Sequence, residues 1–261
     1  MLGAIAGDIA GSAYEWNKVA DREFPLFPNA ADFTDDSVLT IAVAEAILRN
    51  IDDGVPDYRK SIHNYGRKWR GRGYGGMFRR WLASSDLKPY NSYGNGSAMR
   101  ASPVAWAYND EATVLRQAAH SAEVTHNHPE GLKGAQSTAL AIFLARNGET
   151  KDAIRSRIER EFDYDLQRSV EEIRPVYSFD ETCQGSVPES IIAFMDSTDF
   201  ESAIRNGIWL GGDADTQACI AGSIAEAFYG GVPSTIDSEV RKRLDSELIV
   251  VIDDFNARFR K

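Results

Sequence analysis

The sequence is poor in the residues that build disulfide scaffolds and zinc sites. Its 261 residues include only two cysteines and four histidines. Cys183 and Cys219 are too few and too far apart to indicate a disulfide framework. His126 and His128 are the one close histidine pair, and no third histidine or cysteine lies nearby to complete a zinc site. We therefore expect His126 to form hydrogen bonds or contact a ligand.

Positive charge and long hydrophobic runs are also scarce. The chain has 29 Lys and Arg against 39 Asp and Glu, which gives a net charge of −10 and a pI near 5.0. This balance argues against a stable nucleic-acid partner, which would need clustered basic residues. The N-terminal segment lacks the basic region of a signal peptide and contains Asp8, and no stretch is apolar enough to cross a membrane. We expect a cytoplasmic protein, and the sequence leaves its oligomeric state open, with a monomer favoured.

Linkers, low-complexity tracts and internal repeats are missing, which predicts one domain spanning residues 1–261. Alternating strand patterns are scarce, whereas apolar residues recur at three- and four-residue steps along most of the chain. The predicted fold class is all-α. The predicted helices cover residues 2–14, 37–50, 57–70, 74–84, 97–108, 111–122, 130–147, 150–161, 166–173, 187–196, 199–208, 215–229 and 237–259.

Small residues mark the first predicted helix, where Gly3, Gly7 and Gly11 stand four residues apart. Interior glycines weaken a helix, so we expect this stripe to let a second helix approach closely. Asp8, on the same side, is expected to be structural. An irregular segment, residues 16–36, follows this helix, and segments of that length in a compact protein are commonly functional.

Two acidic clusters each stand at the start of an apolar predicted helix. Their members are Thr34, Asp35, Asp36 and Ser37 in the first cluster, and Asp213, Asp215 and Thr216 in the second. A helix start accommodates acidic groups through its free N–H groups and dipole. Carboxylate and hydroxyl oxygens without cysteine or histidine are ligands for magnesium, manganese or calcium. If the fold brings the clusters together, four carboxylates and two threonine hydroxyls would form a site that needs divalent ions.

Ordinary helix capping is the competing interpretation of each cluster. A cap needs only one Asp or Thr, so the surplus of acidic groups in both clusters favours metal binding. Glu15 is a further candidate ligand, because it stands at the end of the first predicted helix, where the dipole disfavours negative charge. A solvated glutamate is the simpler interpretation of that position alone.

A glycine-rich loop, residues 92–97, precedes the helical sequence AMRASPVAWAY. Backbone N–H groups of such a loop can hold phosphates, and Tyr93 offers a ring on which a base could stack. Arg100 is a nearby cation that could equally be structural. Because no GKS or GKT follows, P-loop nucleotide chemistry is disfavoured. A flexible turn is the alternative.

Taken in order, these motifs resemble the ADP-ribosylglycohydrolases, a family that includes the dinitrogenase reductase-activating glycohydrolase and the ADP-ribosyl-acceptor hydrolases. The resemblance rests on GAIAGDIAGSAYE, FTDDS, GRGYGGM, SYGNGSAMR, SAEVTH, SVPES and LGGDADTQACIAGSIAEAFYG. It implies a compact orthogonal helical domain with two divalent cations, Mg²⁺ or Mn²⁺, in a central cleft.

The resemblance also implies roles for individual residues. The implied metal ligands are Thr34, Asp35, Asp36, Asp213, Asp215 and Thr216, with Glu15 as an additional mobile ligand. The implied ADP-ribose contacts are Ser92, Tyr93, Gly94 and Asn95 at the diphosphate and adenine, His126 at the ligand, and Gly75 and Gly76 at the distal ribose. The candidate catalytic groups are Asp35, Asp36 and Glu15. His128 matches no role in the family.

The implied activity is metal-dependent hydrolysis of the glycosidic bond between ADP-ribose and an acceptor, such as an ADP-ribosylated arginine or serine side chain. Either Asp35 or Asp36 could accept the proton of the attacking water. A catalytically inactive ADP-ribose-binding protein is the alternative, although both acidic clusters are intact. The DxDT string also echoes haloacid dehalogenase phosphohydrolases, but the preceding hydrophobic strand is missing. The acceptor should be selected at the cleft rim, residues 16–33 and 174–188.

Overall fold

The computed structural model describes residues 1–50 and 55–260, and within those ranges it contains helices and no β-strand. The prediction of an all-α protein is confirmed. The helices are α1 (Leu2–Ser12), α2 (Asp35–Asn50), α3 (Tyr58–Lys68), α4 (Gly76–Ala83), the 3-10 helix η1 (Asn95–Ser97), α5 (Ser102–Ala107), α6 (Glu111–Glu123), α7 (Pro129–Arg146), α8 (Lys151–Phe162), α9 (Val170–Ile173), α10 (Cys183–Met195), α11 (Phe200–Leu210), α12 (Ala214–Phe228), α13 (Ser234–Arg243) and α14 (Ser246–Phe259).

Two predicted helices are wrong in their extent. The predicted helix 237–259 is two helices, because Leu244 is extended (ψ 146°) between α13 and α14. Asp245 precedes α14, and its carboxylate accepts a hydrogen bond from Trp69 Nε1 at 2.7 Å. The predicted helix 97–108 is η1, a turn and the short α5, which begins next to Pro103, a residue suited to the first turn of a helix.

Three other boundaries differ by less, and one of them belongs to the predicted helix 166–173, which begins only at Val170 as α9. Helix α10 begins at Cys183 rather than at residue 187, because Thr182 caps it by accepting a hydrogen bond from Gly185 N at 3.1 Å. Helix α1 ends at Ser12, before Glu15, so Glu15 lies in the turn that follows the helix.

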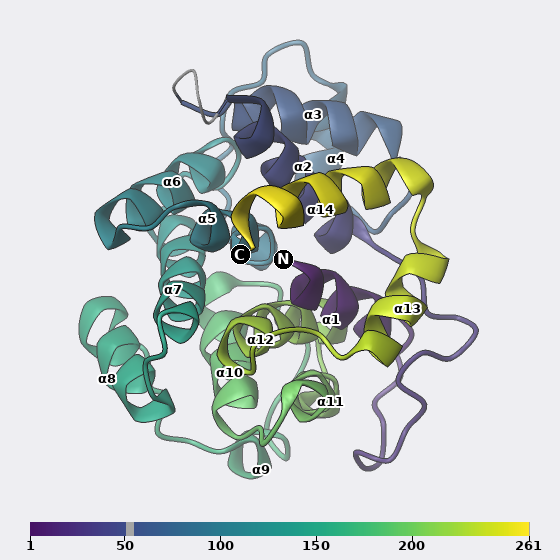
Figure 1. The fold of residues 1–261 in the computed structure, drawn as a ribbon, viewed down its shortest axis with the longest axis vertical. Helices are drawn as coiled ribbons and strands as arrows, with labels where there is room; N and C mark the ends of the chain where they lie inside the picture. Colours follow the sequence, from purple (N-terminus) through teal and green to yellow (C-terminus); the bar gives the residue numbers. More distant parts are fainter. Residues whose placement is uncertain (51–54, 261) are drawn as a thin grey trace.

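Helices α1 and α12 form the centre of the molecule. Residues 2–11 and 214–227 are buried on every side, and Figure 1 shows the other helices arranged around this pair. Long apolar helices that are buried all round cannot be amphipathic, which explains why their sequences show no polar face. No helix in the described part of the chain is both long and apolar enough to cross a membrane.

The glycine stripe of α1 is the contact surface for α12, as predicted. A Cβ atom at Gly7 would lie 2.0 Å from the carbonyl oxygen of Ala218, and one at Gly11 would lie 2.5 Å from the carbonyl oxygen of Ala214. Both positions leave no room for a side chain. The close approach places the end of α1 directly against the start of α12, where the second acidic cluster lies.

Candidate metal and ligand cleft

Asp8 positions the first acidic cluster. This fully buried residue of α1 accepts hydrogen bonds from the backbone N–H groups of Thr34 and Ser37, both at 3.0 Å, and from both of their hydroxyl groups. One carboxylate therefore caps the start of α2 from a different helix. The carboxylates of Asp35 and Asp36 are held at the end of α2 that faces α1.

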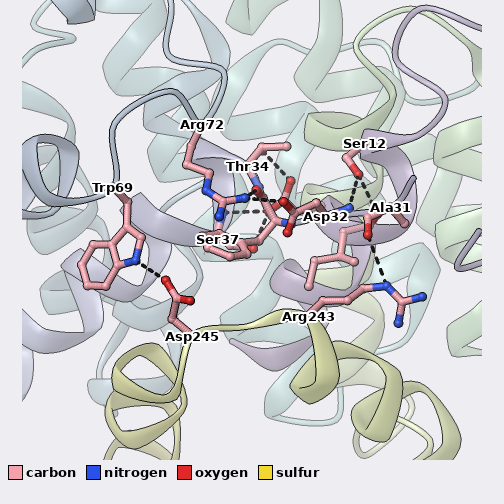
Figure 2. Close-up of polar contacts among 12 residues, drawn as sticks. Ser12, Ala31, Asp32, Thr34, Ser37, Trp69, Arg72, Arg243 and Asp245 are labelled. Carbon is pink, nitrogen blue, oxygen red and sulfur yellow. Dashed lines mark hydrogen bonds and ion pairs between the residues drawn. The ribbon is translucent and has the colours of Figure 1, made fainter. Parts of the chain in front are cut away.

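The segment before α2 is fixed by contacts with distant parts of the chain (Figure 2). Ser12 Oγ accepts from Asp32 N at 3.1 Å, and Arg243 Nε donates to the carbonyl oxygen of Ala31 at 3.2 Å. Arg72 forms an ion pair with Asp32, and its own carbonyl accepts from Asp35 N at 2.6 Å. The first turn of α2 is thus held on three sides.

The second acidic cluster begins α12. Gly211 and Gly212 have positive φ angles of 78° and 91°, which glycine adopts without strain, and they turn the chain into the helix. Asp213 is the N-cap residue, and Asp215 and Thr216 belong to the first turn. All three are between 5% and 7% exposed. The polar groups are therefore largely removed from water.

The structure brings both clusters to one cleft of about 470 Å³. The predicted metal-binding residues that line it are Glu15, Thr34, Asp35, Asp36, Asp213, Asp215 and Thr216. One carboxylate oxygen each from Glu15, Asp213 and Asp215 lies within 4.8 Å of the others. Two helix starts that are far apart in the sequence, together with the turn after α1, thus form one acidic site.

Burial raises the pKa values of these carboxyl groups. Burial, followed by the charges of Asp215 and Asp8, raises the pKa of Glu15 to about 7. Burial raises the pKa of Asp213 to about 6, against the lowering effect of its hydrogen bonds. For Asp35, Asp36 and Asp215, burial and the neighbouring carboxylates raise the pKa well above the ordinary value. Repulsion among the carboxylates thus adds to burial in disfavouring their charged forms.

The donor set fits a divalent cation. In the described residues, no Lys or Arg forms an ion pair with the five carboxylates of the cleft. Oδ2 of Asp36 is buried and has no hydrogen-bond partner within those residues. Buried anionic oxygens without protein partners are costly unless a cation neutralises them. An all-oxygen set of this kind suits Mg²⁺ or Mn²⁺.

The glycine-rich loop lies beside the acidic site and lines the same cleft. It is held by the segment before α10, because Asn95 N donates to the carbonyl of Glu181 and Cys183 N donates to the carbonyl of Tyr93, both at 2.8 Å. The Asn95 side chain donates to Asp213 Oδ2 at 2.6 Å. Tyr93 is 47% exposed, so its ring is accessible at the cleft.

His126 lies beneath this loop as a neutral imidazole. Burial, then the charge of Arg100, holds its pKa well below the ordinary value. Thr125 Oγ1 accepts from Arg100 Nη2 at 2.9 Å and lies 2.7 Å from His126 Nδ1. The Thr125 hydroxyl also forms a hydrogen bond with Tyr90. Nε2 of His126 faces the glycine-rich loop and lies 3.3 Å from where a Cβ of Gly96 would be.

His128 has a structural role instead. It is the N-cap residue of α7, and its Nδ1 accepts a hydrogen bond from Glu130 N at 3.1 Å. Its ring lies 5.3 Å from the ring of Tyr93, centroid to centroid. The sequence pattern gave it no role because capping by histidine is uncommon and the Tyr93 contact joins distant segments.

Some residues of the cleft were not predicted, and for Arg100 a ligand-binding and a structural role had both been left open. Gly73 has a φ of 99°, and a Cβ there would lie 2.8 Å from Asp35 Oδ1, closer to the acidic cluster than the predicted Gly75 and Gly76, which also line the cleft. Arg100 is fully buried, lines the cleft, and has unpartnered Nε and Nη1 atoms within the described residues. The GRGYGG string was the available signal for Gly73.

The two irregular segments expected to form the rim meet at the cleft. Trp16 stacks on Phe179 with ring centroids 5.3 Å apart, and Lys18 Nζ donates to the carbonyl oxygen of Tyr177 at 2.9 Å. Phe179 also lines the cleft. Trp16 is 76% exposed, which is unusual for so large an apolar side chain.

Comparisons with known proteins identify relatives over most of the chain. The ADP-ribosylglycohydrolase family profile matches residues 1–261. ADP-ribosylhydrolase ARH3 of Bos taurus and its Homo sapiens counterpart are each 28% identical, over 88% of this chain and 84% of theirs. ADP-ribosylarginine hydrolase Tri1 of Pseudomonas putida is 26% identical, over 89% of this chain and 71% of its own. A solved "ADP-ribosylglycohydrolase-related protein complex" is similar with a TM-score of 0.73 and 25% identity, over 98% of this chain and 95% of that one.

Proposed function

The chain belongs to the ADP-ribosylglycohydrolase family, and from that premise we propose that it is a metal-dependent hydrolase that releases ADP-ribose from a modified acceptor. The observation that supports this most is the convergence of both acidic clusters beside the glycine-rich loop in one cleft. A non-catalytic binding protein would not need five buried or half-buried carboxylates that form no ion pair within the described residues. The site therefore favours catalysis over binding alone.

The acidic residues of the cleft would hold two divalent cations, Mg²⁺ or Mn²⁺. The proposed ligands are Thr34, Asp35, Asp36, Asp213, Asp215 and Thr216, with Glu15 as an additional ligand. When bound, the ions would supply positive charge that orients the ribose hydroxyls and favours deprotonation of a water molecule. Asp8 supports this set from behind, because it is fully occupied by hydrogen bonds with Thr34 and Ser37.

The acidic side chains of the cleft would contribute to the reaction in two further ways. Asp35 or Asp36 would accept the proton of the attacking water, since both carboxylates line the cleft in which that water would be held. The carboxylates would also stabilise the positive charge that develops on the ribose as the glycosidic bond breaks. Both effects use charges that are already in place.

The glycine-rich loop would bind the ADP part of the substrate. The exposed ring of Tyr93 would stack on the adenine, and Ser92, Gly94 and Asn95 would contact the diphosphate. His126 Nε2, which faces this loop, would form a hydrogen bond with the ligand there. Gly75 and Gly76 would adjoin the distal ribose, where the acceptor is attached.

The proposed acceptor is an ADP-ribosylated protein side chain, arginine or serine. One relative is named an ADP-ribosylarginine hydrolase, which supports the arginine linkage. The test is a panel of arginine-linked and serine-linked ADP-ribose substrates and O-acetyl-ADP-ribose, each with Mg²⁺ and with Mn²⁺, for the wild type and for Asp213→Asn. We expect release from at least one linkage by the wild type only. Tight metal binding without release from any substrate would contradict the proposal.

A further inference from the structure

A strongly basic segment stands out in this acidic protein. Residues 58–85 contain eight of the 29 Lys and Arg residues and none of the 39 Asp and Glu residues. The rest of the chain thus holds 21 basic residues against all 39 acidic ones. The segment forms α3, α4 and the loop between them, which lie together at the top of Figure 1. The positive charge is local, so it is not visible in the net charge.

Most of these cations have no acidic partner within residues 1–50 and 55–260. Lys68 forms an ion pair with Glu247 and Arg72 with Asp32, and Figure 2 shows the Arg72 contact. The six basic residues of the segment for which the described residues provide no ion pair are Arg59, Lys60, Arg67, Arg70, Arg79 and Arg80. In the rest of the described chain, most Arg residues form an ion pair with an acidic side chain, so these six residues differ in lacking one there.

Three of the unpaired arginines surround one pocket. Arg67, Arg70 and Arg79 line a pocket of about 420 Å³ between α3 and α4, together with apolar atoms of Leu82. Tyr74 lines the same pocket, is only 3% exposed, and its buried hydroxyl has no hydrogen-bond partner among the described residues. Arginine guanidinium groups and a free hydroxyl are donors that suit a carboxylate.

The pocket adjoins the acidic cleft through α4. Gly76 lines the cleft, and the place where its Cβ would be lies 3.9 Å from Nη2 of Arg79 and 3.9 Å from Nη1 of Arg80. Arg80 lines the cleft and Arg79 lines the pocket, although they are consecutive in the sequence. A chain that leaves the cleft beside Gly76 would therefore reach the arginines within a few residues.

We propose that this α3–α4 pocket binds an acidic side chain of the acceptor polypeptide, next to its ADP-ribosylated residue. The inference rests on the proposed function, because it assumes that the acceptor leaves the cleft beside Gly76. Arginine holds carboxylates in a bidentate geometry, and Leu82 offers an apolar wall to the aliphatic part of a glutamate. A nucleic acid fits less well, because the acidic remainder of the protein would repel a long polyanion.

The experiment compares two ADP-ribosylated peptides that differ only in glutamate or glutamine residues flanking the modified residue. The proteins are the wild type, the pocket variant R67Q/R70Q/R79Q and the control R155Q/R160Q/K242Q. The control loses the same charge from α8 and α13, which lie away from α3 and α4 in Figure 1. All substituted side chains are at least partly exposed, and thermal unfolding will verify that each variant is folded.

We expect the wild type and the control to have a KM about tenfold lower for the glutamate peptide, a ratio worth about 1.4 kcal/mol. The pocket variant should lose this preference while kcat is unchanged, and both variants should hydrolyse O-acetyl-ADP-ribose at the wild-type rate. Equal KM values for the two peptides with the wild type, or an unchanged preference in the pocket variant, would overturn the inference while leaving the proposed function intact.

A binding measurement separates this inference from the proposed function. Unmodified glutamate and glutamine peptides with a fluorescent label are titrated with each protein, and anisotropy is recorded at low and at high salt. We expect the wild type and the control to bind the glutamate peptide more tightly at low salt, and only the pocket variant to lose this preference. That result would support binding of an acidic side chain in the pocket even if no substrate is cleaved. Displacement of the glutamate peptide by a single-stranded oligonucleotide at a lower concentration than by unlabelled peptide would overturn the assignment to a polypeptide.

Discussion

Asp8 behind the cleft and Asp36 in its lining are both buried, yet they have opposite surroundings. Asp8 accepts hydrogen bonds from Thr34 and Ser37, both backbone and hydroxyl. Asp36 has an Oδ2 atom without a partner in the described residues. A buried carboxylate that accepts hydrogen bonds stabilises the fold, whereas a buried carboxylate oxygen without a partner is costly until a cation neutralises it. The two should therefore respond differently to substitution.

Replacing Asp8 with alanine should destabilise the protein by roughly 3 kcal/mol or more, because two N–H groups and two hydroxyls lose their acceptor. Magnesium binding should weaken as well, since the start of α2 loses its support. Urea unfolding and metal titration will measure both effects. Thr150→Ala, which removes an ordinary cap of α8, is the matched control and should cost about 1 kcal/mol without affecting metal binding. Equal losses in the two variants would contradict this role of Asp8.

Replacing Asp36 with asparagine should raise the melting temperature of the metal-free protein. The raised pKa of Asp36 means that the fold disfavours its charge, and an amide of the same shape removes that cost. The increase in melting temperature on adding Mg²⁺ should shrink. Asp254→Asn, at an exposed position of α14, should change neither quantity. A lower metal-free melting temperature for Asp36→Asn would count against the cation site.

The role of a single residue could be predicted only where residues next to it in the sequence form a recognisable pattern. The surplus of acids in Asp35–Asp36 and in Asp213–Asp215 predicted one converging site, and the cleft contains both. The capping role of Asp8 could not be predicted in this way, because its partners belong to another helix. The roles of these residues in metal binding and catalysis stay predictions.

At the scale of elements, the contact between α1 and α12 sets the geometry of the cleft. Their glycine and alanine residues allow the two backbones to touch, so Glu15 after α1 reaches Asp213 and Asp215 at the start of α12. A wider spacing of the helices would separate these carboxylates. Backbone contact at the glycine stripe is therefore a condition for the acidic site.

Gly7→Ala should destabilise the protein by at least about 2 kcal/mol, because the added Cβ would lie 2.0 Å from the carbonyl oxygen of Ala218. Gly76→Ala is the matched control. A Cβ at Gly76 would meet only the flexible ends of two arginines at 3.9 Å, so the free energy of unfolding should change by no more than about 0.5 kcal/mol. Denaturant unfolding of both variants measures the difference, and a Gly7→Ala protein as stable as the wild type would refute the packing argument.

Helix periodicity predicted most elements, and it failed where neighbouring helices share one apolar pattern. The predicted helix 237–259 continues across Leu244 and Asp245 in its periodicity, yet the chain turns there. The apolar residues on each side face the same core, so the pattern does not reveal the break. Asp245 as a possible N-cap was the only local signal, and its contact with Trp69 depends on the fold.

At the scale of the whole molecule, the acidic cleft should make stability depend on pH and on divalent cations. The pKa of Glu15 is raised from 4.5 to about 7, and that of Asp213 from 3.8 to about 6. When folding raises the pKa of a carboxyl, the folded state binds its proton more tightly than the unfolded state does. The contribution of such a group to the free energy of unfolding is therefore fully present below about pH 4 and is lost as the pH rises through about 6 to 7.

Divalent cations should reverse this loss, because they bind the ionised carboxylates in competition with protons. The rise in melting temperature on adding Mg²⁺ should therefore be small at pH 5 and grow until about pH 8. Thermal unfolding with chelator and with Mg²⁺ across this range provides the measurement. A rise as large at pH 5 as at pH 8 would show that the stabilising ions bind elsewhere.

The central claim is that the buried carboxylates of α2, α12 and the turn after α1 hold the cations that hydrolysis requires. The most direct test is a titration of the chelator-stripped protein with Mg²⁺ or Mn²⁺ while release of ADP-ribose is followed from the substrate that the linkage panel identifies. We predict no release before metal is added, recovery that saturates as the ions bind, and no recovery in Asp213→Asn. Release at the full rate without metal, or recovery in Asp213→Asn equal to that of the wild type, would contradict the account.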